Sequence, residues 1–472
     1  MKLNSQRFAS ALLFLTLFIA GNPVGRAQGV TPFDRQSQPT APPVNVLSQQ
    51  PEMFPQTTSQ TGATPAQYPP PIIVPPFDET PIAGTQGLLV ETLDGRKVSE
   101  TAADQGFNPA SAVKLATALT ALRTFGPQYR FTTAVWTTGT FDQATGTITG
   151  DLYISGRDPS FHYEHAVQLA RELNRQGIRT VTGDLIVAPR FTMNFDSSTQ
   201  RSGEQLYDTL DQTRRPAAAA RAWNDERAII GDDASLANVA PGVAVMGAVY
   251  IDSVPREARM LLVHRSSKLV DVLKVLLCYS NNFMAERIGD TLGGPQAVRR
   301  TVVSSAHVAP WEVSLASTSG LGVNRVTPRA MMKVLRALRD ELAKNNLELS
   351  DILPVAGIDP GTLHKRYTNY SSRGSVIAKT GTLTLTDGGA SALVGEMHTA
   401  TNETLLFVIL NQRGNVSRFR ENQDRLVTQI QNSHGGAASF AYRPLKLAMR
   451  LADTETGAAN PARKDEYEPA SN

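Results

Sequence analysis

The first pattern in the sequence that suggests chemistry is a serine and a lysine three residues apart, Ser111 and Lys114. Apolar residues recur after them at helical spacing, so both side chains are expected on one face near a helix start. A serine hydroxyl is a weak nucleophile until a base takes its proton. Lysine can be that base only where burial or a nearby positive charge lowers its pKa. The pair therefore predicts a serine nucleophile with Lys114 as its base.

A second pair of polar residues, Ser280 and Asn282, is separated by one residue. That spacing allows both side chains to face the same cleft. Ser280 is predicted to relay a proton between Lys114 and a leaving group, and Asn282 is predicted to hold an amide of the substrate. Cys278 lies just before them in an apolar segment and is interpreted as a small buried hydrophobic residue.

The third pattern is Lys379, Thr380 and Thr382, in a short segment predicted to be a strand. A strand edge can pair with an extended peptide. The two threonine hydroxyls beside a lysine suit a terminal carboxylate, and the lysine could supply the charge that lowers the pKa of the base. The oxyanion hole is predicted to be the backbone N–H groups of Ser111 and Thr382.

The elements that must position these residues follow from apolar spacing and turn residues. A strand is expected over 88–93, ending at a hairpin signal, Asp94-Gly95. Asn108-Pro109 favours the start of a helix that runs to residue 122. We expect further helices over 268–292, 328–345 and 418–431, and further strands over 376–379, 391–397 and 405–410.

A weak internal repeat separates the first two patterns. Residues 147–154 resemble residues 180–187, and both copies contain Thr-Gly-Asp-Leu. The segment between them, 163–176, has helical spacing, which predicts a strand–helix–strand unit. We interpret residues 136–257 as an inserted α/β subdomain.

The ends of the chain differ in composition from its centre. A positive start and an apolar run indicate a secretory signal at 1–27, with an uncleaved membrane anchor as the alternative. Residues 28–85 hold 13 prolines and predict a linker, with a docking segment as the alternative. The polar C-terminal tail, 435–472, is expected to lack structure after Ala452. The protein is therefore expected to be exported.

Composition excludes several classes of function. A net charge of +3 argues against a nucleic-acid binder, and a single cysteine excludes an internal disulfide or a multi-cysteine metal site. His162 and His165 have metal-like spacing but no evident third ligand. We expect no metal and no cofactor, and the sequence defines no oligomeric state.

The three patterns, in this order, resemble the signature of class A β-lactamases and penicillin-binding proteins. Over residues 87–430 the chain resembles the D-alanyl-D-alanine carboxypeptidase/endopeptidase family, the class C low-molecular-mass penicillin-binding proteins. The resemblance extends to residues 107–111, 115–133, 150–160 and 353–363. It implies an α/β (α+β) transpeptidase-like domain, an antiparallel sheet flanked by helices, formed by 86–135 and 258–434 around the insertion.

The resemblance implies an activity. A serine D-Ala-D-Ala carboxypeptidase, and possibly endopeptidase, would cleave peptidoglycan stem peptides through an acyl-enzyme on Ser111. β-Lactams would be covalent inhibitors, and the location would be the periplasm or cell envelope of a bacterium. The alternatives are a serine β-lactamase and a non-catalytic peptidoglycan-binding protein. Glu172 precedes the second motif, so its order is wrong for the β-lactamase deacylation glutamate.

Three departures from the family pattern stand out. The middle residue of the second motif is Asn281 where aspartate is commoner, and Ser317 occupies the place of a family acid. Two extra residues, near Asp387-Gly388, follow the third motif.

Overall fold

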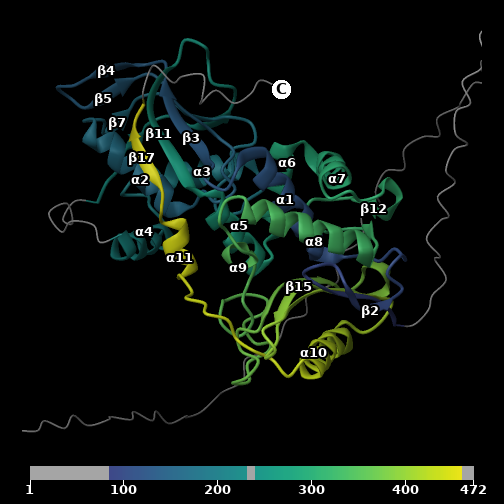
Figure 1. The fold of residues 1–472 in the computed structure, drawn as a ribbon. Coiled ribbons are helices and arrows are strands. Elements are labelled where there is room, and N and C mark those ends of the chain that lie inside the picture. The colour runs from purple at the N-terminus through teal and green to yellow at the C-terminus, as the bar shows by residue number, and fades with distance from the viewer. Residues whose placement is uncertain (1–83, 231–239, 460–472) are drawn as a thin grey trace, which may run out of the picture. The chain divides into compact units, whose positions relative to one another are not determined.

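A computed structural model describes residues 84–230 and 240–459. The predicted signal, 1–27, and all but the last two residues of the predicted linker, 28–85, lie outside these ranges. Two large sheets organise the described residues: one carries the third motif and the other belongs to the insertion (Figure 1). None of the helices in the described ranges has the length and apolar character needed to cross a membrane.

The sheet that carries the third motif has five strands, and each neighbouring pair is antiparallel, as expected from the family resemblance. The strand with Lys379 is at the edge, so one side of its backbone is open. The strand order is β14 (Val376–Leu383), β15 (Ala390–His398), β16 (Thr404–Gln412), β1 (Thr85–Thr92) and β2 (Lys97–Thr101).

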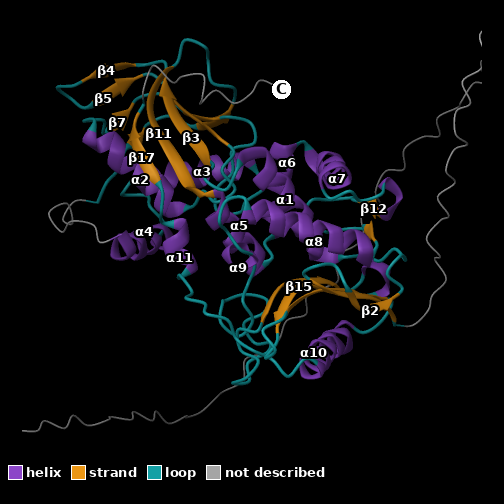
Figure 2. Ribbon diagram, viewed as in Figure 1, coloured by secondary structure: helices purple, strands orange, loops and turns teal. Residues whose placement is uncertain are grey.

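This sheet is buried on both faces, which explains the continuous apolar run of β16 at 405–410. Residues 406, 408 and 410 join a core with the helices on one face, and residues 405, 407 and 409 join a core that includes Val427 of α10 (Val416–Ser433). Figure 2 shows α10 on one side of the sheet and α8 (Pro328–Ala343) on the other. The sheet is therefore a rigid central layer that fixes the position of the third motif.

The predicted helical segment 268–292 is two helices with a break at Ser280. Ser280 has a left-handed backbone, with φ of +56°, and ends the first helix. The Asn281 side chain then caps the second helix by accepting a hydrogen bond from the backbone N–H of Met284, at 3.0 Å. The helices on this side of the sheet are α1 (Lys114–Phe125), α5 (Leu269–Tyr279), α6 (Asn282–Leu292), α7 (Gly294–Ser305), α8 and the short α9 (Leu349–Ile352).

The inserted unit contains the predicted strand–helix–strand repeat, and its strands pair in parallel. A third copy, 244–251, was missed because it lacks the threonine and aspartate of the others, although it keeps Gly247. In each copy the first strand joins a four-stranded sheet and the second joins the six-stranded sheet. The copies are β5 (Thr147–Thr149) and β6 (Leu152–Gly156), β7 (Thr180–Val181) and β8 (Leu185–Val187), and β9 (Ala244–Val245) and β10 (Val249–Ile251). The helices are α2 (Tyr163–Arg175), α3 (Thr199–Leu210) and α4 (Ala217–Ile230).

Glycine and aspartate explain why the repeat recurs. Asp151 Oδ1 accepts a hydrogen bond from the backbone N–H of Asp184 at 2.8 Å, and Asp184 Oδ1 accepts one from Ala248 at 2.7 Å. A Cβ at Gly183 would lie 2.6 Å from the carbonyl oxygen of Gly150. Each aspartate therefore binds the next copy of the repeat. The last copy has no following copy to bind, and it has Ala248 where the others have aspartate.

The six-stranded sheet also includes two longer strands, β3 (Arg130–Thr137) and β11 (Arg259–Lys268), which pair with each other. The predicted limits of the insertion, 136–257, assigned most of β3 and all of β11 to the catalytic domain. The small strand β4 (Thr140–Asp142) pairs with β5.

The expectation of an unstructured tail after Ala452 is wrong for residues 455–458. These residues form β17 (Glu455–Ala458), which pairs antiparallel with β11, after a short helix α11 (Leu447–Leu451). The Thr456 hydroxyl also contacts His264 Nδ1, at 2.7 Å. Backbone pairing at a sheet edge needs few apolar side chains, which is why composition gave no sign of this strand.

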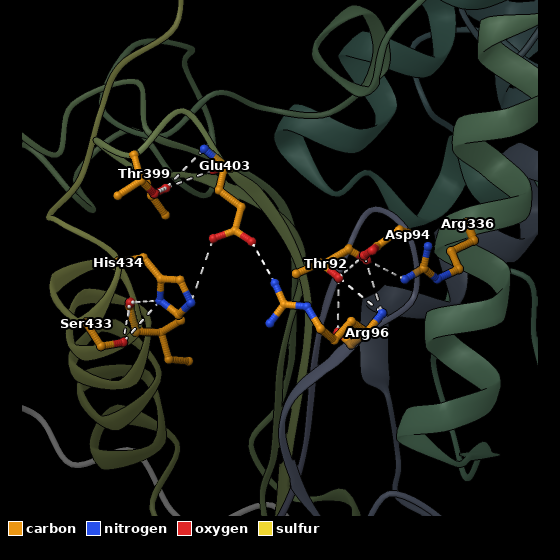
Figure 3. Close-up of polar contacts among 10 residues, drawn as sticks. Thr92, Asp94, Arg96, Arg336, Thr399, Glu403, Ser433 and His434 are labelled. Atoms are coloured by element: carbon orange, nitrogen blue, oxygen red, sulfur yellow. Dashed lines mark hydrogen bonds and ion pairs between the residues drawn. The ribbon is translucent and has the colours of Figure 1, made fainter.

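A polar network lies at the end of the five-stranded sheet away from Thr382 (Figure 3). Glu403 accepts a hydrogen bond from Arg96 at 3.1 Å, and His434 Nε2 lies 3.9 Å from its other oxygen. Arg336 donates to the backbone oxygen of Leu93, at 2.8 Å. The network joins the β1–β2 hairpin to α8, α10 and the β15–β16 turn.

We expect Gly183→Ala to destabilise the inserted unit by about 1–3 kcal/mol, because the new Cβ would overlap backbone atoms of the preceding copy. Gly457→Ala is the matched control, since its Cβ would meet nothing within 4 Å. Urea unfolding of both variants checks this, and equal midpoints for the two would contradict the packing described.

Candidate active site

The structure brings the three predicted motifs together around one cleft of about 600 Å³. Ser111 lies on a short 3-10 turn (Ala110–Val113) that leads into α1, and Lys114 is the first residue of α1. The second motif comes from the α5–α6 break and the third from the edge of β14. The residues lining the cleft are Ser111, Ser280, Asn282, Thr362, Arg366, Thr380, Thr382, Arg420, Glu421 and Asp424.

Close backbone packing holds the turn that carries Ser111. Asn108 Oδ1 accepts a hydrogen bond from the Ala110 N–H at 3.0 Å, and Ala110 has a left-handed φ of +46°. A Cβ at Gly320 would lie 2.0 Å from the carbonyl oxygen of Ala110, and a Cβ at Gly381 would lie 2.6 Å from that of Pro109. Glycine is therefore required on both sides of the turn.

Lys114 is fully buried and its ammonium contacts the hydroxyl of Ser111. Nζ donates to Ser111 Oγ at 3.0 Å, to Asn282 Oδ1 at 2.7 Å and to the backbone oxygen of Ser319 at 2.6 Å. Burial lowers the pKa of Lys114 to about 7, against an opposing influence from Glu286. A substantial fraction is therefore neutral near pH 7 and can accept the serine proton.

Lys379 is also fully buried, and it contacts the second motif. Its Nζ donates to Ser280 Oγ at 2.8 Å and to the backbone oxygen of Thr380 at 2.7 Å. Burial and the neighbouring Lys114 lower the pKa of Lys379 well below its usual value. The two lysines thus contact different serines, Lys114 that of the first motif and Lys379 that of the second. The predicted relay through Ser280 from Lys114 stays a prediction.

Glu286 was missed in the sequence. Its carboxylate accepts hydrogen bonds from the Ser319 N–H at 2.9 Å and from Thr318 Oγ1 at 2.8 Å. Burial raises the pKa of Glu286, but these hydrogen bonds outweigh burial and leave it below its usual value. Glu286 thereby holds the segment whose carbonyl accepts from Lys114. Its position four residues after Asn282, on the same face of α6, was a usable signal.

The outer part of the cleft was also missed. Its charged residues come from α10 and from the segment before β14: Arg366 pairs with Asp424, and Arg420 Nη2 donates to Thr382 Oγ1 at 2.7 Å. The sequence spacing does not predict that α10 contacts the motifs, because α10 and the third motif come together only when the sheet has formed.

Two departures from the family pattern have clear structural roles. The Ser317 hydroxyl donates to the backbone oxygen of Leu321 at 2.8 Å and accepts from the Gly320 N–H at 3.0 Å, so it closes a turn. Asp387 forms an ion pair with Arg325 at 2.8 Å and accepts from Asn108 Nδ2 at 2.6 Å. The extra residues after the third motif therefore bind the loop before Ser111.

Comparison with known proteins agrees with this geometry. Residues 82–230 and 205–432 match the family described as D-Ala-D-Ala carboxypeptidase 3 (S13). The chain belongs to this family. It is therefore a serine peptidase of the D-alanyl-D-alanine carboxypeptidase/endopeptidase type, and the resemblance noted in the sequence is confirmed.

Individual relatives of this S13 chain are distant. A carboxypeptidase of Mycobacterium tuberculosis is 26% identical over 73% of this chain and 79% of its own length. A D-alanyl-D-alanine carboxypeptidase of Actinomadura is 26% identical over 81% of this chain and 83% of its own.

Solved structures share the fold. A predatory endopeptidase of Bdellovibrio bacteriovorus, acylated by penicillin G, has a TM-score of 0.66 and 22% identity, covering 80% of this chain and all of its own. Penicillin-binding protein 4 of Haemophilus influenzae has a TM-score of 0.56 and 21% identity, covering 76% of this chain and 98% of its own.

The low pKa of Lys114 predicts the pH dependence of D-alanine release. Below pH 7 Lys114 is protonated. If it is the base, kcat/KM should therefore rise about tenfold per pH unit and level off above about pH 7. Rates measured between pH 5 and 9 check this, with Lys114→Ala as the comparison, expected to be about 10²–10⁴-fold slower. A value of kcat/KM that stays constant between pH 5.5 and 7.5 would exclude Lys114 as the base.

Proposed function

We propose that Ser111 is the nucleophile of a DD-peptidase that acts on peptidoglycan stem peptides in the bacterial cell envelope. The observation that carries this proposal is the contact of 3.0 Å between Ser111 Oγ and the buried ammonium of Lys114. Ser111 lines the cleft, with Thr380 and Thr382 of the edge strand β14 also in its lining, and Lys114 is buried behind Ser111.

The chemistry begins with proton transfer from Ser111 Oγ to neutral Lys114. The oxygen attacks the carbonyl of the penultimate D-alanine, and the backbone N–H groups of Ser111 and Thr382 stabilise the negative oxygen. The C–N bond then breaks as the departing amine takes the proton of Ser280 Oγ. Lys114 passes the proton that it took from Ser111 to Ser280 and becomes neutral again, and an ester on Ser111 remains. Water hydrolyses the ester and frees the serine.

Substrate binding uses the remaining motif residues. Asn282 lies 2.7 Å from Lys114 Nζ and in the cleft wall, so its amide can both orient the base and bind the peptide. The backbone of β14 pairs with the extended peptide, and the side chains of Thr380 and Thr382 face its C-terminus. Lys379, beneath them, holds Ser280.

β-Lactams fit the same site because they present an amide carbonyl followed by a carboxylate. A β-lactamase would also need a base aimed at the deacylating water. Among the described residues, Glu172 pairs with Arg175 and does not line the cleft. Two carboxylates do line it, Asp424 and Glu421, but both come from α10, after the third motif, and Asp424 is held by Arg366. A peptidase is therefore favoured over a β-lactamase.

Ser111→Ala should abolish covalent labelling by penicillin without unfolding the protein, because the attacking atom is gone. Intact-protein mass spectrometry measures the adduct. Ser317→Ala is the control, since its hydroxyl closes a turn outside the cleft lining and labelling should persist. An adduct of undiminished yield on Ser111→Ala would exclude this nucleophile.

The penicilloyl adduct of the unaltered protein should outlast many turnovers of a D-Ala-D-Ala peptide. The leaving group of penicillin stays covalently attached to the acyl group and blocks the approach of water. The D-alanine of the peptide departs, so water can reach the ester. Mass-spectrometric decay of the adduct is compared with D-alanine release. Rapid decay, with no D-alanine released from any stem peptide, would favour the β-lactamase and overturn the proposal.

A further inference from the structure

Arg420 is an exposed arginine of α10 in the outer part of the cleft, where it contacts the third motif. Its Nη2 donates to Thr382 Oγ1 at 2.7 Å, and Arg420 is one of the residues lining the cleft. Thr382 is the last residue of the third motif, opposite Ser111. The guanidinium therefore lies at the end of the cleft where the C-terminus of an extended peptide would be bound.

The other cations of the site are already engaged. Both Nε and Nη2 of Arg366 donate to Asp424 Oδ1, at 2.9 and 2.5 Å. Lys114 and Lys379 are buried and donate to serine, amide and backbone oxygens. Of the two arginines that line the cleft, Arg420 is the one for which the described residues supply no carboxylate within ion-pair distance.

The hydroxyl of Thr382 cannot by itself offer a proton to an anion in this arrangement. It donates its single proton to the backbone oxygen of Gly381 at 2.8 Å and accepts from Arg420. A guanidinium has five N–H donors in a planar fork that matches a carboxylate. One of them is used on Thr382, so the others are free to form a bidentate pair with an incoming anion.

We propose that Arg420 binds the free C-terminal carboxylate of the peptide and makes this enzyme selective for peptides that end in an acid. The proposal rests on the function proposed above. It adds the residue that distinguishes a free carboxylate from an uncharged group at the C-terminus. The Thr380 hydroxyl, which also lines the cleft, then orients the carboxylate, and the arginine supplies the charge.

The test compares two forms of one peptide, Nα,Nε-diacetyl-Lys-D-Ala-D-Ala as the free acid and as the C-terminal carboxamide. For the unaltered enzyme, kcat/KM should be higher for the acid. Arg420→Ala should lower kcat/KM for the acid by roughly 10- to 100-fold, mainly through KM, and leave the carboxamide within about twofold. Arg420→Lys, which keeps the charge and loses the fork, should recover part of the preference.

Arg418→Ala is the matched control. Arg418 is exposed on the same turn of α10 and its backbone N–H, which the substitution keeps, caps the helix on Asn415. This variant removes the same charge and should keep the acid preference. An unchanged acid-to-amide ratio in Arg420→Ala, or an equal loss on both substrates, would overturn the proposal. If the unaltered enzyme cleaves neither peptide, the proposed function itself fails.

Discussion

The site depends on the burial of one ammonium group against a serine hydroxyl. Lys114 has no exposed surface, and burial brings its pKa from 10.5 to about 7. Each pKa unit corresponds to about 1.4 kcal/mol, so this burial costs about 5 kcal/mol of stability below pH 7. The folded pKa lies below the unfolded one, so the cost shrinks as pH rises from about 7 towards 10.5. The rest of the fold must supply that energy.

The surrounding structure keeps Lys114 from moving away to solvent. Its three hydrogen-bond partners come from three segments: the turn that carries Ser111, the start of α6 and the loop at Ser319, which Glu286 holds in place. Gly320 and Gly381 let backbone approach the turn from both sides. The five-stranded sheet, which is buried on both faces, fixes the position of the third motif on the other side of the cleft from Ser111. The ammonium of Lys114 is therefore held in position by packing that is complete before any substrate binds.

The sequence predicted the motifs and most elements well because both are local features. Ser111 and Lys114 share a face by helical spacing, and the apolar run of β16 is contiguous. The break at Ser280 depends on a left-handed backbone that composition does not indicate. β17 pairs through its backbone, and Arg420 reaches Thr382 only after α10 has packed on the sheet. These features depend on tertiary contacts, which the spacing of residues along the chain does not predict.

The most direct test of the central claim is a titration of the Lys114 ammonium itself. Protein labelled with ¹³C at lysine Cε would be followed by NMR from pH 5 to 11, with the Lys114 signal assigned by its loss in Lys114→Arg. We expect a midpoint near pH 7, far below that of the exposed lysines. A midpoint near 10.5 would show that Lys114 stays charged at neutral pH and is not the base.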